Sequence, residues 1–122
     1  MEVNYNDNIV CFDVDLTLVS PAHNPAQVDL KLRNPYSGTT SEFKVHRGHV
    51  ELLKQYFGRG YFIRVWSHGG VQWAETVVKA LNLEKYVDSI ETKPIKLVDD
   101  LPVEKIFKNV IYLNEHGEEN KG

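Results

Sequence analysis

Apolar and polar positions follow two different periods along this chain of 122 residues. A continuous apolar run at 8–12 predicts a strand buried on both faces, as in a parallel sheet. Apolar side chains then recur at every second position on both sides of a turn at 34–38. This alternation predicts a hairpin-like flap over about 22–46.

Farther along, the apolar residues recur at helical spacing and then return to short continuous runs. The pattern predicts helices at 47–57 and 70–83, strands at 61–66, 86–90, 94–98 and 110–113, and a helical turn at 101–104. Strands that alternate with helices predict one α/β domain over residues 1–122, with a mainly parallel, five-stranded Rossmann-like sheet and no separate cap domain. The link at 91–94 has no room for a helix, so either its two strands are joined unusually or one of them does not form. A polar tail at 114–122 is expected to fray.

Charge and cysteine content narrow the class of protein. The net charge of −3 gives no overall basic field that would attract nucleic acid or an anionic membrane. The single cysteine, Cys11, excludes an intramolecular disulfide and favours a reducing compartment. No run approaches the roughly 20 apolar residues of a membrane span, and the polar start of the chain does not resemble a secretory signal. We therefore expect a cytoplasmic protein with no membrane partner.

Polar side chains able to take part in catalysis follow four of the predicted strands. In chain order they are Asp13, Asp15, Ser67, His68, Lys93, Asp99 and Asp100. Ligands of open α/β sheets bind outside the carboxyl ends of the strands, so these groups are expected to converge. Carboxylates this close repel one another unless a cation joins them, and oxygen ligands without a His or Cys cluster favour Mg²⁺.

The same residues resemble the four motifs of the haloacid dehalogenase superfamily. The segment 13–17 reads Asp-Val-Asp-Leu-Thr and matches the family's DxDxT signature, and the strand ending at Ser67 looks like the second motif. Lys93, followed by proline, is similar to the third motif, and the run 95–100, which ends in two aspartates, looks like the fourth. The motifs occur in the family's order. The compact spacing is similar to small phage-type members and to the phosphatase domain of polynucleotide kinase.

The resemblance implies a Mg²⁺-dependent phosphatase that works through an aspartyl-phosphate. Asp13 would be the nucleophile, and Asp15 would protonate the leaving oxygen and then activate water. Thr17, Ser67, His68 and Lys93 would brace the loop or hold the phosphoryl group, with Lys96 as the alternative lysine. The metal would lie among Asp13, Asp15, Asp99 and Asp100, with Asp100 the favoured ligand of the last pair. Asp15 favours phosphoryl transfer over dehalogenation, and Leu16 replaces the family's usual glycine.

Several interpretations stay open at this level. The substrate is either a phosphorylated small molecule or a phosphorylated nucleic-acid end, whose backbone the flap residues Lys31, Arg33, Tyr36 and Lys44 could touch. A catalytically silent phosphate- or partner-binding module is the alternative of another class. A receiver domain is disfavoured, because its paired acids precede its phosphoacceptor. Ser67 could also cap the helix that follows it, and the aspartates at 99 and 100 could cap a helical turn.

Overall fold

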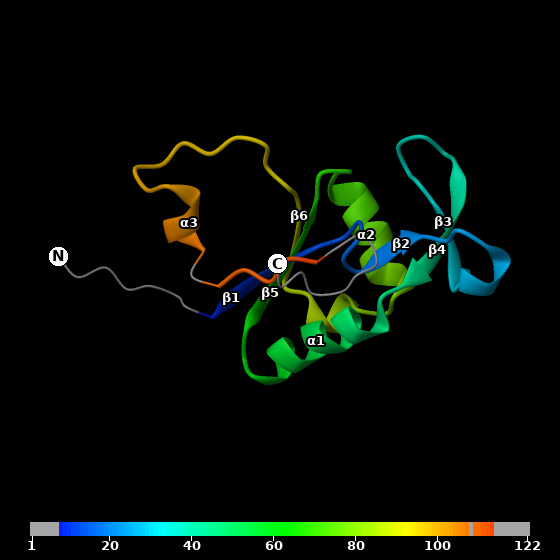
Figure 1. Cartoon of the computed structure of the whole chain (residues 1–122), viewed down its shortest axis with the longest axis horizontal. Helices are drawn as coiled ribbons and strands as arrows, with labels where there is room; N and C mark the ends of the chain where they lie inside the picture. Colours follow the sequence, from blue (N-terminus) through cyan, green and yellow to red (C-terminus); the bar gives the residue numbers. More distant parts are fainter. Residues whose placement is uncertain (1–7, 108, 114–122) are drawn as a thin grey trace.

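The computed structural model describes residues 8–107 and 109–113. Its elements in chain order are β1 (Ile9–Asp13), β2 (Val19–Pro21), η1 (Pro25–Gln27), β3 (Leu30–Arg33), β4 (Thr40–Val45), α1 (Arg47–Gly58), β5 (Phe62–Ser67), α2 (Val71–Ala80), η2 (Glu84–Tyr86), β6 (Ser89–Thr92) and α3 (Val103–Ile106) (Figure 1). The architecture is α/β, with one parallel sheet of three strands and one antiparallel sheet of three strands. No helix of the described part is long and apolar enough to cross a membrane.

The parallel sheet has the order β1-β5-β6, so its carboxyl ends share one edge. The register aligns Asp13 with Trp66, and Ser67 with Thr92. Along β5, Ile63 and Val65 are fully buried because they face the helices, whereas alternate residues are partly exposed. Leu53 of α1 and the apolar stripe of α2 complete this core.

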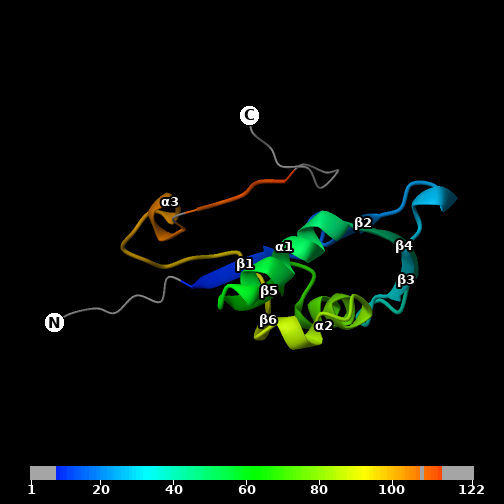
Figure 2. The same ribbon diagram turned by 90° about the horizontal axis from the view of Figure 1, so that it is seen from below.

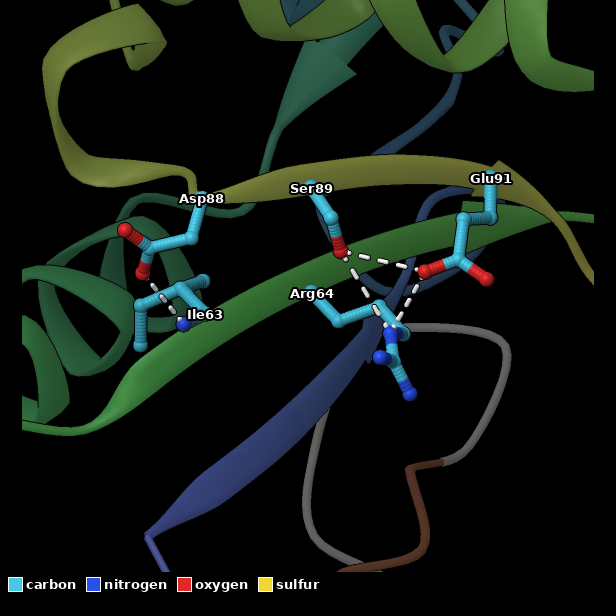
Figure 3. A network of polar contacts seen from close by, with 5 residues as sticks. All are labelled: Ile63, Arg64, Asp88, Ser89 and Glu91. Carbon is cyan, nitrogen blue, oxygen red and sulfur yellow. Dashed lines mark hydrogen bonds and ion pairs between the residues drawn. The ribbon is translucent and has the colours of Figure 1, made fainter.

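Polar contacts between β5 and β6 fix their register (Figure 3). The Asp88 carboxylate accepts a hydrogen bond from the Ile63 backbone N–H at 2.8 Å. Arg64 forms an ion pair with Glu91, with Nε and Oε2 2.6 Å apart, and the Ser89 hydroxyl contacts both side chains. Burial raises the pKa of Cys11, which lies opposite Arg64, and the neighbouring guanidinium only partly offsets this rise. The thiol is therefore a packing group rather than a nucleophile.

The predicted flap is present as the antiparallel sheet β2-β4-β3. Its turn is held by Asn34, whose Oδ1 accepts hydrogen bonds from the backbone N–H groups of Tyr36 and Ser37. In both views the flap lies beside α2, beyond the end of β1 that carries Asp13 (Figures 1 and 2). The Tyr36 hydroxyl accepts a hydrogen bond from the Gln72 backbone N–H at 3.1 Å, which joins the turn to the start of α2.

The structure corrects the C-terminal part of the predicted sheet. Residues 94–98 and 110–112 lie outside every strand, so the parallel sheet has three strands rather than five. Two residues separate β6 from position 95, far too few for the crossover that a parallel strand needs. The apolar side chains there face solvent, with Ile95 93% and Val98 92% exposed. The third strand lies at 89–92 rather than 86–90, and the helical turn at 103–106 rather than 101–104. The predicted tail at 114–122 lies outside the described residues.

A buried histidine makes the stability of the fold depend on pH. Ser20 Oγ and His46 Nε2 lie 2.5 Å apart, and both residues are buried. Burial lowers the pKa of His46 below its ordinary value of 6.5, and the nearby charges of His49 and Lys44 lower it further. The unfolded chain therefore takes up this proton at a higher pH than the folded chain does. We expect the free energy of unfolding to be at its full value above about pH 6.5 and to fall as the pH drops below it.

Urea titrations of the wild type and of His46→Gln between pH 5 and pH 8 would measure this dependence. The variant should be less stable than the wild type at pH 8 and should lose less further stability on acidification. Parallel pH profiles for the two proteins would show that the dependence arises elsewhere.

Candidate phosphoryl-transfer site

The loop after β1 is tightly folded around a buried valine. Val14 is fully buried, and its carbonyl oxygen accepts hydrogen bonds from the backbone N–H groups of Thr17, Leu18 and Val19. Leu16 has a φ of 65°, in the left-handed region where glycine is favoured. Glycine, which is usual at this position in the family that the motifs resemble, would adopt this backbone freely, whereas Leu16 holds it at some cost in strain.

Asp15 is held by donors on both of its carboxylate oxygens. The Ser67 hydroxyl donates to Oδ2 at 3.2 Å, and the indole Nε1–H of Trp73 donates to Oδ1 at 3.1 Å. Both donors are buried, so they fix the direction of the carboxylate. The residue pattern of the second helix gave no sign of this contact, although a buried indole N–H generally requires an acceptor.

The Ser67 hydroxyl is fully engaged within the protein. It donates its single proton to Asp15 and accepts a hydrogen bond from the Gly69 backbone N–H at 2.9 Å. A hydroxyl has one proton, so Ser67 cannot also donate to a phosphoryl oxygen in this arrangement. The predicted phosphate ligand is therefore, in this structure, a residue that positions Asp15.

Asp13 lies half-buried at the end of β1, between charges of both signs. Burial raises the pKa of its carboxyl group, and the charge of Asp15 raises it further. The charges of Lys93 and His68 and a hydrogen bond from the Val14 backbone lower it. Lys93 and His68 are therefore near enough for their charges to act on Asp13. The Lys93 backbone N–H donates to the Ser67 carbonyl at 2.9 Å, which anchors this lysine at the carboxyl edge of the sheet.

Thr17 and Lys96 were also predicted for the site, and the structure gives them different surroundings. Thr17 braces the loop through its backbone, since its carbonyl oxygen lies 2.7 Å from His49 Nδ1 and can only accept a hydrogen bond. Lys96 is exposed in the segment that follows β6, and Lys93 is the lysine whose charge acts on Asp13. The geometry therefore favours Lys93 over Lys96.

This structure does not bring Asp99 and Asp100 to the site. Both are exposed, and Asp99 Oδ1 accepts a hydrogen bond from the Leu101 backbone N–H at 2.9 Å, which lowers the pKa of Asp99. In both views the segment between β6 and α3 runs toward the end at which β1 begins, away from the edge that carries Asp13 (Figures 1 and 2). The turn-capping alternative describes Asp99 better than metal binding does.

Oxygen donors for a metal are consequently few. Across residues 8–107 and 109–113 there is no group of three or more His, Cys, Asp or Glu side chains placed to hold an ion. Mg²⁺ is commonly held by one or two carboxylates, with water and substrate phosphate completing its shell. Both carboxylate oxygens of Asp15 already accept hydrogen bonds, so the Asp13 carboxylate and the backbone carbonyl oxygen of Asp15 are the groups that would form this smallest kind of magnesium site.

A polar pocket of about 370 Å³ adjoins Asp15 beneath the flap. Its lining residues are Asp15, Leu32, Asn34, Ser37, Thr39, Ser41, Phe43, Gly69 and Trp73. The pocket joins the carboxylate of the β1 loop to the inner face of the β3–β4 hairpin. Sequence reasoning located the flap but not these polar lining residues, because their convergence depends on how the hairpin is docked.

None of the comparisons with family models, curated proteins and solved structures finds a match to this chain. A proposal of function therefore rests on the geometry of the site and on the motif resemblance.

Proposed function

We propose that this protein is a Mg²⁺-dependent phosphomonoester hydrolase of the haloacid dehalogenase type, acting through an aspartyl-phosphate. The observation that carries the proposal is that the side chains of Asp13 and Asp15 have different surroundings. The charge of Lys93 acts on Asp13, whose side chain has no hydrogen bond to another side chain among the described residues, whereas Asp15 is oriented by Ser67 and Trp73. A nucleophile must be free to approach phosphorus, and an acid/base group must be aimed at one atom.

The first step transfers the phosphoryl group to the enzyme. A carboxylate oxygen of Asp13 attacks phosphorus, the bond from phosphorus to the ester oxygen breaks, and Asp15, which must be protonated for this step, gives that oxygen its proton. Lys93 offsets the negative charge that gathers on Asp13 and the phosphoryl oxygens. His68 directly follows β5, and its backbone N–H has no acceptor among the described residues. This N–H can therefore donate to one of the phosphoryl oxygens.

The second step releases phosphate. Asp15, now a carboxylate, takes a proton from a water molecule, whose oxygen attacks phosphorus and displaces the Asp13 carboxylate. Inorganic phosphate leaves, and both aspartates return to their starting states. The Asp13 carboxylate and the backbone carbonyl oxygen of Asp15 would hold Mg²⁺, which would supply positive charge that reduces the repulsion between the nucleophile and the phosphate.

A phosphate-release assay over a broad panel of phosphomonoesters tests this function. We expect turnover with Mg²⁺ and loss of at least about 100-fold after chelation with EDTA, because the site has two close carboxylates and one lysine to balance a dianionic phosphate. Restoring Mg²⁺ should restore activity. Turnover of every substrate at the buffer rate, with or without metal, would contradict the proposal.

One observation favours a second candidate, a phosphate-binding module without turnover. Asp99 and Asp100 remain away from Asp13, so the site lacks the third carboxylate that the family resemblance implies. Such a module would bind inorganic phosphate through Lys93 and would release none from any ester.

A further inference from the structure

The pocket beside Asp15 differs in character from the phosphoryl site. Apart from Asp15, every residue lining it is uncharged. One wall is aromatic, since the rings of Phe43 and Trp73 lie 5.5 Å apart at an interplanar angle of 45°. The opposite rim carries the amide and hydroxyl side chains of Asn34, Ser37, Thr39 and Ser41.

Several of these rim groups have hydrogen-bonding capacity left for a ligand. Asn34 Oδ1 is used by the turn, which leaves its Nδ2 donors. Ser37 Oγ accepts from the Thr39 backbone N–H at 3.2 Å and keeps its own proton. The hydroxyls of Thr39 and Ser41 have no partner among the described residues. The rim therefore presents neutral donors and acceptors across from an aromatic wall.

The strand register turns the flap's basic residues away from this pocket. Opposed residues of an antiparallel pair share one face of the sheet, and Leu32 with its partner Ser41 lies on the pocket face. Lys31 and Arg33 alternate with Leu32 and so lie on the other face, where Lys31 opposes Glu42. A polyanionic nucleic-acid strand in the pocket would meet no cation from β3.

We propose that this pocket binds the leaving group and selects a compact, uncharged, hydroxyl-rich one, so that the preferred substrates are sugar or polyol monophosphates. This inference rests on the proposed function, in which Asp15 protonates the leaving oxygen. Because Asp15 also lines the pocket, the group attached to that oxygen must enter it. Aromatic faces pack against the C–H faces of sugar rings, and the rim groups match sugar hydroxyls. Ligand pockets span about 300–1,000 Å³, so this one suits a small metabolite.

Kinetics with paired substrates and a matched variant pair test the proposal. Thr39→Val and Ser41→Ala each remove one pocket hydroxyl, and Thr40→Val makes the same change as the first on a neighbouring residue that does not line the pocket. We expect kcat/KM for ribose 5-phosphate or glucose 6-phosphate to fall about 5- to 10-fold in each pocket variant and to stay unchanged in Thr40→Val. Turnover of p-nitrophenyl phosphate, which has no sugar hydroxyls, should fall clearly less than that of the sugar phosphates in the two pocket variants and stay the same in Thr40→Val.

Two outcomes would overturn the substrate class. One is an equal response of the pocket variants and Thr40→Val towards sugar phosphates. The other is a wild-type preference for oligonucleotides with 3′- or 5′-phosphates that is lost in Lys31→Gln and Arg33→Gln, which would assign the outer face of the flap to nucleic acid.

Failure of the hydrolase proposal gives a separate signature. If the wild type turns over no ester at all, including p-nitrophenyl phosphate, the hydrolase proposal fails. An NMR titration with glucose 6-phosphate then decides on the pocket. Shifts at the Thr39 and Ser41 amides that are absent in Thr39→Val would uphold the ligand class, and no shifts in the wild type would overturn it.

Discussion

Asparagine in place of Asp13 is expected to lower kcat by about 1,000-fold or more, because an amide oxygen is too weak a nucleophile to form the phosphoryl ester. The substitution keeps the size of the side chain, so the loop and the pocket should be unchanged. Phosphate release under saturating substrate measures the effect. Glu75→Gln, the same chemical change at an exposed position on α2, should retain full activity.

The same substitution should stabilise the protein. Burial raises the pKa of folded Asp13 above its ordinary value of 3.8, which means that the folded state binds this proton more tightly than the unfolded state does. At neutral pH the ionised carboxylate therefore opposes folding, and Asp13→Asn removes that cost. We expect a higher Tm for the variant at pH 7, with the difference shrinking as the pH falls toward 3.8.

Loss of activity together with a lower Tm would mean that the variant is damaged rather than chemically disabled. An unchanged kcat would exclude Asp13 as the nucleophile. The pH profile of the wild type gives an independent check. Its acid limb should lie higher than that of an ordinary aspartate, because the nucleophile must be ionised and burial raises its pKa.

Gly70→Ala is expected to have the largest effect on stability. Gly70 has a φ of 101°, which L side chains rarely adopt, and a Cβ there would clash with the Tyr36 hydroxyl oxygen. The substitution must therefore strain the turn before α2 and push Tyr36 out of its hydrogen bond with Gln72. We expect a loss of about 2–4 kcal/mol in the free energy of unfolding, measured by urea titration.

Two variants separate the parts of this effect. Gly48→Ala lies in α1, where a Cβ meets nothing within 4 Å, so it should leave stability unchanged or raise it slightly. Tyr36→Phe removes the hydroxyl contact without backbone strain and should cost about 1 kcal/mol. If Gly70→Ala proves as harmless as Gly48→Ala, then the turn at Gly70 does not tie the flap to α2.

The strands and helices in the first two-thirds of the chain could be predicted from the apolar pattern, because each depends on residues close together in the sequence. The apolar run ending at Phe12 and the alternation around Leu32 each specify a strand, and both are observed. The C-terminal runs failed because a strand also needs a neighbour. The segment around Val98 is as apolar as a strand, but the two-residue link after β6 cannot carry it to a parallel position.

The candidate site was predictable where it depends on strand ends. Parallel strands end at one edge of their sheet, and this rule of topology puts Asp13, Ser67 and Lys93 at the same edge. The partners of Asp15 were not predictable in the same way. Whether Ser67 donates to a carboxylate or to a phosphate, and whether Trp73 reaches the loop, depends on distances of an ångström that no residue pattern encodes.

The exposed apolar side chains between residues 95 and 112 also affect the calorimetry of the protein. The heat capacity change and the denaturant m-value both scale with the surface that unfolding newly exposes. Ile95, Val98 and Tyr112 are already 93%, 92% and 66% exposed in the folded state, so they add little to either quantity. Both the heat capacity change and the m-value should therefore be smaller than those expected for a fully packed domain of 122 residues.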